Sequence, residues 1–288
     1  MNCHRAVAAT GWAFLSLLGV QLMSACASSA SIRAAPSNPL EARLAPLLPT
    51  PLLLLGEQHD AAEHQVLQRE VVQLLAAQGR LAALVMEMAE QGRSSQGLTQ
   101  QASEAQVREA LAWSDSWPWS SYGPVVMSAV RAGVPVLGGN LPRPAMRAAM
   151  ADAELDQLLP PAALAQQRQD IRDGHCGLLP EAQIAPMTRI QLARDQAMAQ
   201  TLVQALRDHA QAGQTVLLVA GNGHVRRDLG VPRHLPVEWP HQVLMALAAG
   251  SGGQADGEQA LRADAVWAPP ARPPRDYCAE FAAPAKKP

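Results

Sequence analysis

The sequence predicts a single large α/β domain with a mostly parallel sheet, helices on both faces of that sheet and helical insertions. Short apolar runs bounded by turn residues recur along the chain, and they are continuous rather than alternating, as in strands buried on both faces. Segments with helical spacing lie between these runs, which is typical of an α/β sheet. The expected strands are 51–56, 81–88, 134–140, 215–223 and 242–250.

Two segments between the expected strands carry apolar stripes at helical spacing, and each predicts an amphipathic helix. Residues three and four apart share one face of a helix, so these stripes should face the sheet. The first stripe is Leu67, Val71, Leu74 and Leu75, and the second is Met187, Ile190, Met198, Leu202 and Leu206.

The N-terminus predicts a secretory signal peptide over residues 1–25. Arg5 precedes a mostly apolar stretch over residues 10–20, which is shorter than a membrane-spanning helix requires. The following Met-Ser-Ala-Cys resembles a bacterial lipobox, so we expect lipidation at Cys26. By resemblance to such lipoproteins, Ala27 favours the periplasmic face of the outer membrane. Plain secretion after cleavage at an alanine is the alternative.

The rest of the chain divides into a lipidated tether over residues 26–40, the domain over residues 41–280 and a disordered tail over residues 281–288. Charges nearly balance, with a net charge of −2, and no basic stripe is present, so nucleic acid is not an expected partner. Cys176 and Cys278 remain in the mature chain. In an oxidising periplasm they can form a disulfide, and two separate buried thiols are the alternative.

Polar side chains follow four of the expected strands. In a parallel sheet these positions lie at the carboxyl ends of the strands, where ligands bind. Gly56 and His59 enclose one Gly-x-x-His motif, and Gly221 and His224 enclose another. With a carboxylate between them, two such motifs can activate water or hold a divalent metal ion. The strand-end residues are Glu57, His59, Glu87, Asn140, Asn222 and His224. Of these, Glu57, His59, Glu87 and His224 are candidate catalytic residues, and His59, Glu87 and His224 are candidate metal ligands.

The residues after His59 predict the start of a helix. Asp60 and Glu63 have the spacing of a capping box, so we expect the helix to begin immediately after His59. His64 would then lie in the first turn and point toward the same end of the sheet as His59. Its position is equally compatible with a place in the core and with a place in the site, where His64 is a candidate cofactor-binding residue.

Several segments in the same order resemble the ChaN-type haem-binding lipoproteins, in a superfamily that also includes the Tiki, TraB and erythromycin-esterase-like proteins. These segments are "LLLLGEQHDAAEHQ", "VMEMAEQ", "WPWSSYGPVV", "AGVPVLGGNLPR", "GHCGLLPE", "MTRIQLARDQAMAQ" and "AGNGHV". The resemblance covers most of the mature domain. It implies haem binding, with iron held by a tyrosine oxygen and two haems stacked face to face across a homodimer.

Tyr122 and Tyr277 are the tyrosines available for that role. Tyr122 lies in a tryptophan-rich segment. Without the resemblance, this setting favours a Tyr122 that is buried in the core and makes a hydrogen bond there. With the resemblance, Tyr122 is the expected iron ligand and Tyr277 the reserve. His175 is a second haem-binding candidate, in a loop from which it could reach a neighbouring subunit's ligand. Arg194 could pair with a haem propionate, although a salt bridge explains it equally well.

Two functions therefore follow from the sequence. The leading one is an outer-membrane lipoprotein that takes up or stores haem. The alternative is a hydrolase, an esterase or peptidase, that uses the paired Gly-x-x-His motifs. A third interpretation combines them, with the motifs and Tyr122 serving separate ligands.

Overall fold

The computed structural model describes residues 39–247, 262–268 and 276–282. The chain divides into two compact units, residues 1–35 and 36–288, and every described residue lies in the second. The expected signal peptide, Cys26 and nearly all of the tether lie outside the described residues, as does 283–288 of the expected tail. Within the described part, no helix is long and apolar enough to cross a membrane.

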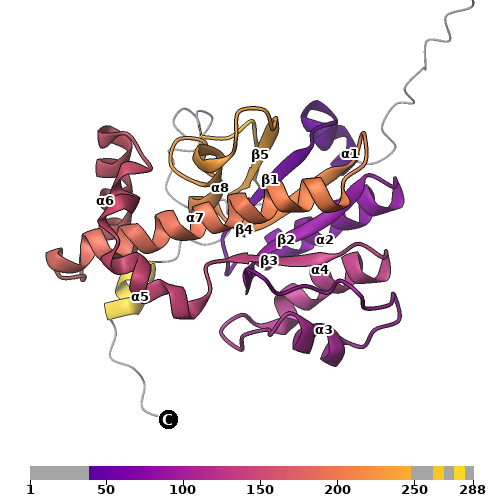
Figure 1. Ribbon diagram of the computed structural model, residues 1–288, viewed down its shortest axis with the longest axis horizontal. Helices are drawn as coiled ribbons and strands as arrows, with labels where there is room; N and C mark the ends of the chain where they lie inside the picture. Colours follow the sequence, from indigo (N-terminus) through magenta and orange to yellow (C-terminus); the bar gives the residue numbers. More distant parts are fainter. Residues whose placement is uncertain (1–38, 248–261, 269–275, 283–288) are drawn as a thin grey trace, which may run out of the picture. The chain divides into compact units, whose positions relative to one another are not determined.

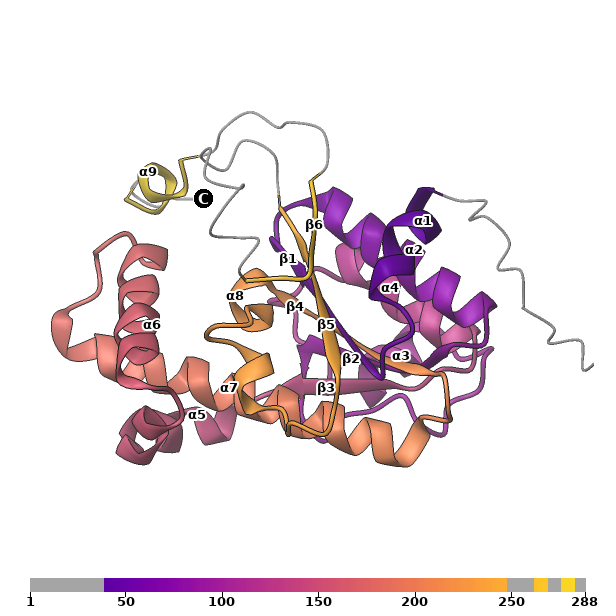
Figure 2. The same cartoon turned by 90° about the horizontal axis from the view of Figure 1, so that it is seen from above.

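The described strands form one parallel sheet in the order β3-β2-β4-β1-β5-β6 (Figure 1; β6 is labelled in Figure 2), which confirms the predicted fold class. Five of these strands coincide with the predicted apolar runs. The sequence did not predict β6, because it is three residues long and partly exposed. The strands are β1 (Leu52–Glu57), β2 (Leu81–Glu90), β3 (Val136–Asn140), β4 (Thr215–Gly221), β5 (His241–Ala246) and β6 (Ala265–Trp267).

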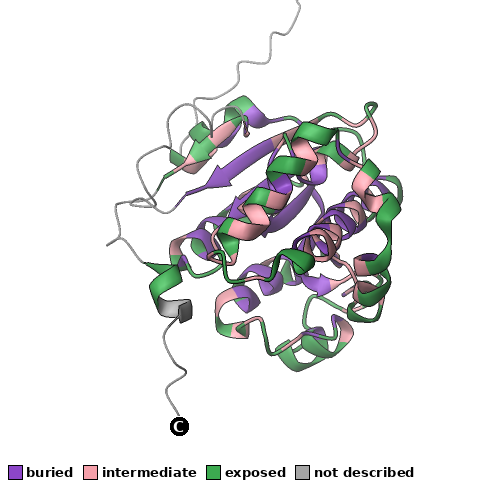
Figure 3. Ribbon diagram, turned by 90° about the vertical axis from the view of Figure 1, so that its left-hand side faces the viewer, coloured by how far each residue is buried: buried purple, intermediate pink, exposed green. Residues whose placement is uncertain are grey.

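The two central strands bring the repeated motifs together. β1 and β4 are neighbours, and their register pairs Gly56 with Ala220 and Glu57 with Gly221. Both strands are buried along their whole length (Figure 3), which explains their continuous apolar sequence. The two Gly-x-x-His motifs therefore leave the sheet side by side at its carboxyl edge.

Helices cover both faces of the sheet. Successive β1 side chains point to opposite faces, so Leu53 and Leu55 join one apolar core and Leu52 and Leu54 join the other. The first core contains residues from α1 (Pro39–Leu44), η1 (Ala45–Leu47), α2 (Ala62–Ala77), α3 (Glu104–Ala110) and α4 (Trp119–Arg131). The second core is closed by α7 (Glu181–His209), through its buried Met198, Leu202 and Leu206.

A helical insertion separates β3 from the segment of α7 that covers the sheet. It consists of α5 (Arg143–Ala151), η2 (Ala153–Gln157) and α6 (Pro161–Gly174), which pack against α7 (Figure 2). Leu159, Leu192 and Leu229 form the small apolar cluster between this insertion and its neighbours. The remaining elements are α8 (Asn222–Val225), η3 (Val231–His234) and α9 (Tyr277–Ala282).

The start of α2 differs from the prediction. The helix begins at Ala62 with Ala61 as its N-cap, and no side chain caps it, so the predicted capping box is wrong. The reason is a turn between strand and helix, in which the Gln58 carbonyl accepts a hydrogen bond from the Ala61 N–H. This turn places Asp60 ahead of the helix, where its carboxylate accepts a hydrogen bond from the Tyr277 hydroxyl at 2.9 Å.

Candidate functional site

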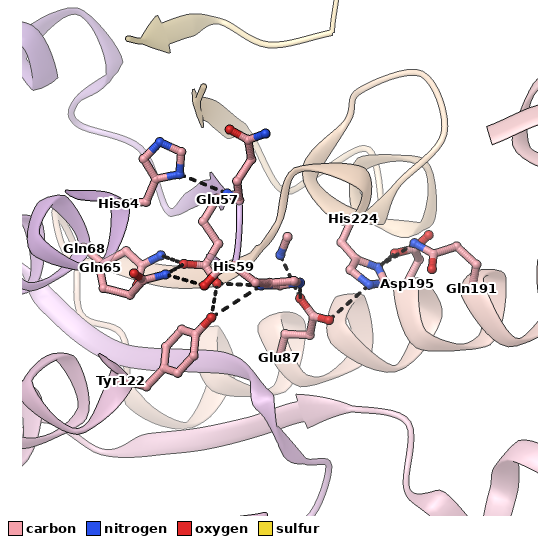
Figure 4. Close-up of polar contacts among 12 residues, drawn as sticks. Glu57, His59, His64, Gln65, Gln68, Glu87, Tyr122, Gln191, Asp195 and His224 are labelled. Carbon is pink, nitrogen blue, oxygen red and sulfur yellow. Dashed lines mark hydrogen bonds and ion pairs between the residues drawn. The ribbon is translucent and has the colours of Figure 1, made fainter. Parts of the chain in front are cut away.

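Glu57, the last residue of β1, is a buried carboxylate that accepts four hydrogen bonds (Figure 4). One oxygen accepts from the Tyr122 hydroxyl at 2.6 Å and from His59 Nδ1 at 2.7 Å. The other accepts from the side-chain amides of Gln65 at 2.6 Å and Gln68 at 2.5 Å. These donors offset the cost of burying a charged group and fix the orientation of Glu57.

His59 is the member of this group that solvent reaches, because 42% of its side chain is exposed. Its Nδ1 donates to Glu57, since an ionised carboxylate can only accept. The edge of its ring meets Trp117, with ring centroids 4.9 Å apart. Its Nε2 lies 3.9 Å from a carboxylate oxygen of Glu87, so His59 connects the two carboxylates.

Glu87 belongs to β2 and is nearly fully buried. One of its oxygens accepts the Gly221 N–H at 2.7 Å, and the other lies 3.4 Å from His224 Nε2. A Cβ at Gly221 would lie 2.9 Å from His59 Nε2. The glycine of the second motif is therefore required for the close approach of β4 to the His59 ring.

His224, in α8, is held between two carboxylates. Its Nε2 faces Glu87, and its Nδ1 lies 2.5 Å from Asp195 on α7 and 2.9 Å from the side-chain amide of Gln191. Asp195 is completely buried. We refer to Glu57, His59, Glu87, His224 and Asp195 as the buried carboxylate–imidazole chain.

Opposite charges set the pKa values within this chain. Burial alone would lower the pKa of His224, but Glu87 and Asp195 outweigh it and raise the pKa to about 10. Burial opposes ionisation of Glu87, but His224 and then His59 lower its pKa to about 2. For Asp195, burial dominates and raises the pKa to about 6. The pKa of His59 is also raised, because Glu57 and Glu87 outweigh the effect of burial.

This arrangement can hold a proton at a solvent-accessible imidazole that is supported by buried carboxylates. His224 is an imidazolium at neutral pH, and Glu87 is ionised beside it. An imidazole in this setting can act as a general acid or base. Within residues 39–247, 262–268 and 276–282, no group of three or more His, Cys, Asp or Glu side chains has the spacing to hold a metal ion.

The structure brings together the four predicted catalytic residues, and Tyr122 joins them. Tyr122 lies on α4, is 1% exposed and donates its proton to Glu57. Burial and the Glu57 charge raise the pKa of its phenol well above the usual range. Tyr122 is thus inside the protein rather than on a surface that a porphyrin could reach. Its contact with Glu57 places Tyr122 in the same hydrogen-bonded network as the first Gly-x-x-His motif.

His64 is separate from the exposed part of the site. It is fully buried in α2, and its Nδ1 accepts the Gln58 N–H at 3.0 Å. Its ring meets the edge of Trp267 in β6, with centroids 5.9 Å apart. The structure therefore gives His64 a supporting role beneath the turn that carries His59.

Arg194 lies beside Asp195 on α7 and is partly exposed. In the described part of the chain, no carboxylate forms an ion pair with its guanidinium, and its Nε is buried without a hydrogen-bond acceptor. A salt bridge therefore does not account for Arg194 in this structure.

His175 and the two mature cysteines meet where α6 ends. His175 is the C-cap of α6, and its Nδ1 donates to the Ile171 carbonyl at 2.8 Å. The next residue, Cys176, forms a disulfide with Cys278, with Cα atoms 5.5 Å apart. Of the two states left open for these cysteines, the structure contains the disulfide.

Sequence reasoning missed the residues that hold the site from the helices: Gln65, Gln68, Gln191 and Asp195. The available signal was a polar residue within a helical apolar stripe. Asp195 precedes Met198 by three residues and Leu202 by seven, so it shares their sheet-facing side. Gln68 precedes Val72 by four residues and Leu75 by seven on α2, so it also shares the face of a buried apolar stripe.

Comparison with known proteins supports both fold and family. None of the curated protein sequences matches this chain. The structure of ChaN of Campylobacter jejuni with cofacial haem has 23% sequence identity and a TM-score of 0.56. The match covers 75% of this chain and 86% of the ChaN chain. The structure of the type III effector HopBA1 has 16% sequence identity and a TM-score of only 0.40. The match covers 74% of this chain and 83% of the HopBA1 chain.

The family described as "Haem-binding uptake, Tiki superfamily, ChaN" matches residues 44–235 of this sequence. That range contains all five residues of the buried carboxylate–imidazole chain, from Glu57 to His224. Because the match spans more than half of the sequence, the resemblance noted in its motifs is confirmed, and the chain belongs to this family.

Proposed function

We propose that this protein binds haem, and that it does so as a lipid-anchored dimer on the periplasmic face of the outer membrane. The observation that carries the proposal is the match to a haem-binding family over residues 44–235. When bound, haem supplies an iron that takes an axial oxygen or nitrogen ligand, with the potential set by that ligand. Uptake and storage both require this binding step.

Two of the predicted haem-binding residues have side chains suited to the group. The Arg194 guanidinium has no carboxylate partner in the described part of the chain, and it can bind a propionate through two parallel hydrogen bonds. The Nδ1 of His175 is occupied by the Ile171 carbonyl. The neutral ring therefore carries its lone pair on Nε2, where it can act as a ligand or accept a hydrogen bond.

The other two predicted residues fit less well. Tyr122 and His64 are 1% and 0% exposed, and each forms a hydrogen bond within the protein. To reach iron, either side chain would have to leave the core, which would break that bond and open a cavity.

The anchor and the assembly are further parts of the proposal. The Cys176–Cys278 disulfide supports an oxidising compartment such as the periplasm. The lipobox-like sequence supports attachment through Cys26. Cofacial haem binding in ChaN of Campylobacter jejuni supports two haems stacked across a dimer of this chain.

A haem titration of residues 27–288, followed by visible absorbance, tests the proposal. We expect saturable spectral changes, and sedimentation velocity should show a dimer in the haem-loaded protein. Absence of any haem-dependent change would contradict haem binding. For the anchor, the full chain should fractionate with outer membranes, whereas Cys26→Ser should not; equal fractionation of both would contradict lipidation.

A second candidate function rests on the buried carboxylate–imidazole chain. Its one exposed imidazole is oriented by Glu57 and lies next to Glu87, which is the arrangement of a general acid or base in a hydrolase. The test is an esterase and peptidase panel with wild type, His59→Ala and the control His209→Ala at the end of α7. Metal analysis of wild type and of the His59→Ala, His224→Ala variant accompanies it. No activity and no bound metal would rule this candidate out.

A further inference from the structure

An open groove of about 790 Å³ lies between α2 and α4, which pack side by side on one face of the sheet (Figure 2). On each helix, the lining residues are three or four positions apart, so each helix contributes one continuous face. We call this feature the α2–α4 groove. It is lined by Arg69, Gln73 and Ala77 of α2 and by Ser128, Arg131 and Ala132 of α4.

The lining of the α2–α4 groove carries positive charge. Arg69 and Arg131 are its charged side chains, and none of the described residues that line it is an aspartate or glutamate. No carboxylate in the described part of the chain forms an ion pair with either guanidinium. A guanidinium without an internal counter-charge can bind a phosphate or a carboxylate through parallel hydrogen bonds.

Each of these arginines has N–H groups that the described residues leave unused. The Nε of Arg69 is buried and has no acceptor among them, and such a donor costs stability until an acceptor reaches it. Arg131 is held in place through Nη1, which donates to the carbonyls of Gln100 at 2.5 Å and Ala102 at 2.8 Å. The backbone therefore fixes Arg131, and its Nε and Nη2 are left for a ligand.

The two arginines lie toward opposite ends of the groove. α2 and α4 each lead to the start of a strand in the same parallel sheet, so they run in the same direction. Gln73 donates to Ser128 at 3.3 Å and aligns the helices at that level. Arg69 lies one turn before this contact and Arg131 about one turn after it, which separates them by roughly 10 Å along the helix axes. One small anion meets one arginine, whereas a surface with many anionic groups meets both.

The groove is close to the point where the chain enters the domain. α1 begins at Pro39, and its Glu41 accepts a hydrogen bond at 2.9 Å from Gln78, the C-cap of α2. Ala77, which lines the groove, directly precedes Gln78. Pro39 follows Cys26 by thirteen residues, and an extended chain of that length spans no more than about 45 Å. With a lipid on Cys26, the groove therefore stays within reach of the membrane surface.

We propose that the α2–α4 groove binds the phosphate groups of anionic phospholipids through Arg69 and Arg131. The binding is non-covalent, with guanidinium N–H groups donating to phosphate oxygens. Soluble phosphate esters share this chemistry, and the separation of the two arginines and the position next to α1 favour lipid head groups. The site goes beyond haem binding, and only the membrane as the source of phosphate rests on the proposed anchor. This contact holds one face of the domain against the lipid surface.

The experiment is sedimentation of residues 27–288 with vesicles of equal parts phosphatidylglycerol and phosphatidylcholine, and with vesicles of phosphatidylcholine alone. This chain lacks Cys26, so vesicle binding is measured without a lipid anchor. The proteins are wild type, an Arg69→Gln, Arg131→Gln variant and the matched control Arg147→Gln, Arg207→Gln, each checked for folding by circular dichroism. The control removes the same charge from exposed positions on α5 and α7.

Wild type should bind the vesicles that contain phosphatidylglycerol and not those of phosphatidylcholine alone. The groove variant should bind about thirtyfold more weakly, as expected for the loss of two arginines at an anionic surface, and the control should bind as wild type does. Equal binding by wild type and the groove variant would overturn the site, and so would an equal loss in the control.

Titration calorimetry with glycerol phosphate separates the two sources of phosphate. If wild type binds glycerol phosphate through the two arginines but does not bind vesicles, the lipid assignment is overturned and the groove takes soluble phosphate esters. If wild type binds neither, the proposal fails altogether. Haem titration and the fractionation of Cys26→Ser measure the proposed function separately, so a failure of the groove does not count against haem binding or the anchor.

Discussion

The buried carboxylate–imidazole chain and the segments around the Cys176–Cys278 disulfide, residues 175–178 and 277–278 (the disulfide region), hold their side chains by different means. In the buried chain, Glu57 is fixed by hydrogen bonds from several elements, Glu87 by the Gly221 N–H and Asp195 by His224, and only His59 is open to solvent. In the disulfide region, one covalent bond fixes a six-residue helix, and the side chains around it are exposed.

The difference predicts which substitutions affect folding and which affect binding. A side chain inside a buried charge network cannot be changed without leaving another charge unpaired. An exposed side chain positioned by a cross-link contributes little to the core, so it can be replaced at little cost in stability.

Glu87→Gln is expected to have the largest effect on stability. The substitution preserves shape and an acceptor for the Gly221 N–H, but it removes the charge between two imidazoles. His224 would then be a buried imidazolium with Asp195 as its one remaining counter-charge. Breaking a buried ion pair costs about 3–5 kcal/mol. Urea unfolding followed by circular dichroism measures this loss, with the exposed Glu109→Gln on α3 as control.

Raising the pH should destabilise the protein through His224. Its pKa in the folded state is about 10, above the ordinary value of 6.5, so the folded state keeps a proton that the unfolded state releases. This contribution to stability is complete below pH 6.5 and is lost as pH rises through 10. One proton corresponds to about 1.4 kcal/mol per pH unit. Urea unfolding between pH 7 and pH 10 should show the decline, and His224→Gln should flatten it; equal slopes would contradict the assignment.

Removing the disulfide by Cys176→Ser with Cys278→Ser should lower the unfolding free energy by about 2–4 kcal/mol, because the bond closes a long loop in the unfolded chain. The cysteines are 102 residues apart. Unlike Glu87→Gln, this change leaves the core contacts intact, so near-ultraviolet circular dichroism of the buried tryptophans should not change. Loss of that signal would show that the disulfide also organises the core.

Tyr122→Phe should have a moderate effect. It removes one of four donors to Glu57 while keeping the ring in place against Trp117. Because Glu57 retains its bonds to His59, Gln65 and Gln68, we expect a loss of about 1–3 kcal/mol. Thermal and urea unfolding measure it. A loss much below this range would mean that the Tyr122 hydroxyl is not essential to the buried network.

The sequence predicted the sheet well because its central strands are buried on both faces. The continuous apolar runs that become β1 and β4 have no other simple explanation. The predicted start of α2 was wrong. The spacing of Asp60 and Glu63 matches a capping box, but the Gln58 carbonyl accepts the Ala61 N–H in a turn that precedes the helix. Local spacing could not reveal that turn.

The site was predictable only in part. The Gly-x-x-His motifs marked the correct strand ends, but the pairing of β1 with β4 is a long-range contact. Asp195 is distant in sequence from His224, and only its place in an apolar stripe marked it. Tyr122 was chosen over Tyr277 for its aromatic neighbours, yet those neighbours are what bury it.

Tyr277→Phe should have the smallest effect on stability, and this makes it the sharpest test of the comparison. Its hydroxyl bonds to an exposed carboxylate, and its ring is half exposed, so the unfolding free energy should change by no more than about 0.5 kcal/mol. If Tyr277 binds iron, the same variant should lose haem affinity without losing stability. The reverse pattern is expected for Tyr122→Phe, because a hydroxyl that fixes a buried carboxylate contributes to folding. Measuring unfolding and haem affinity on both variants therefore assigns the two tyrosines to separate roles. If Tyr277→Phe lowered stability and left haem binding intact, the disulfide region would be a structural brace rather than a binding surface.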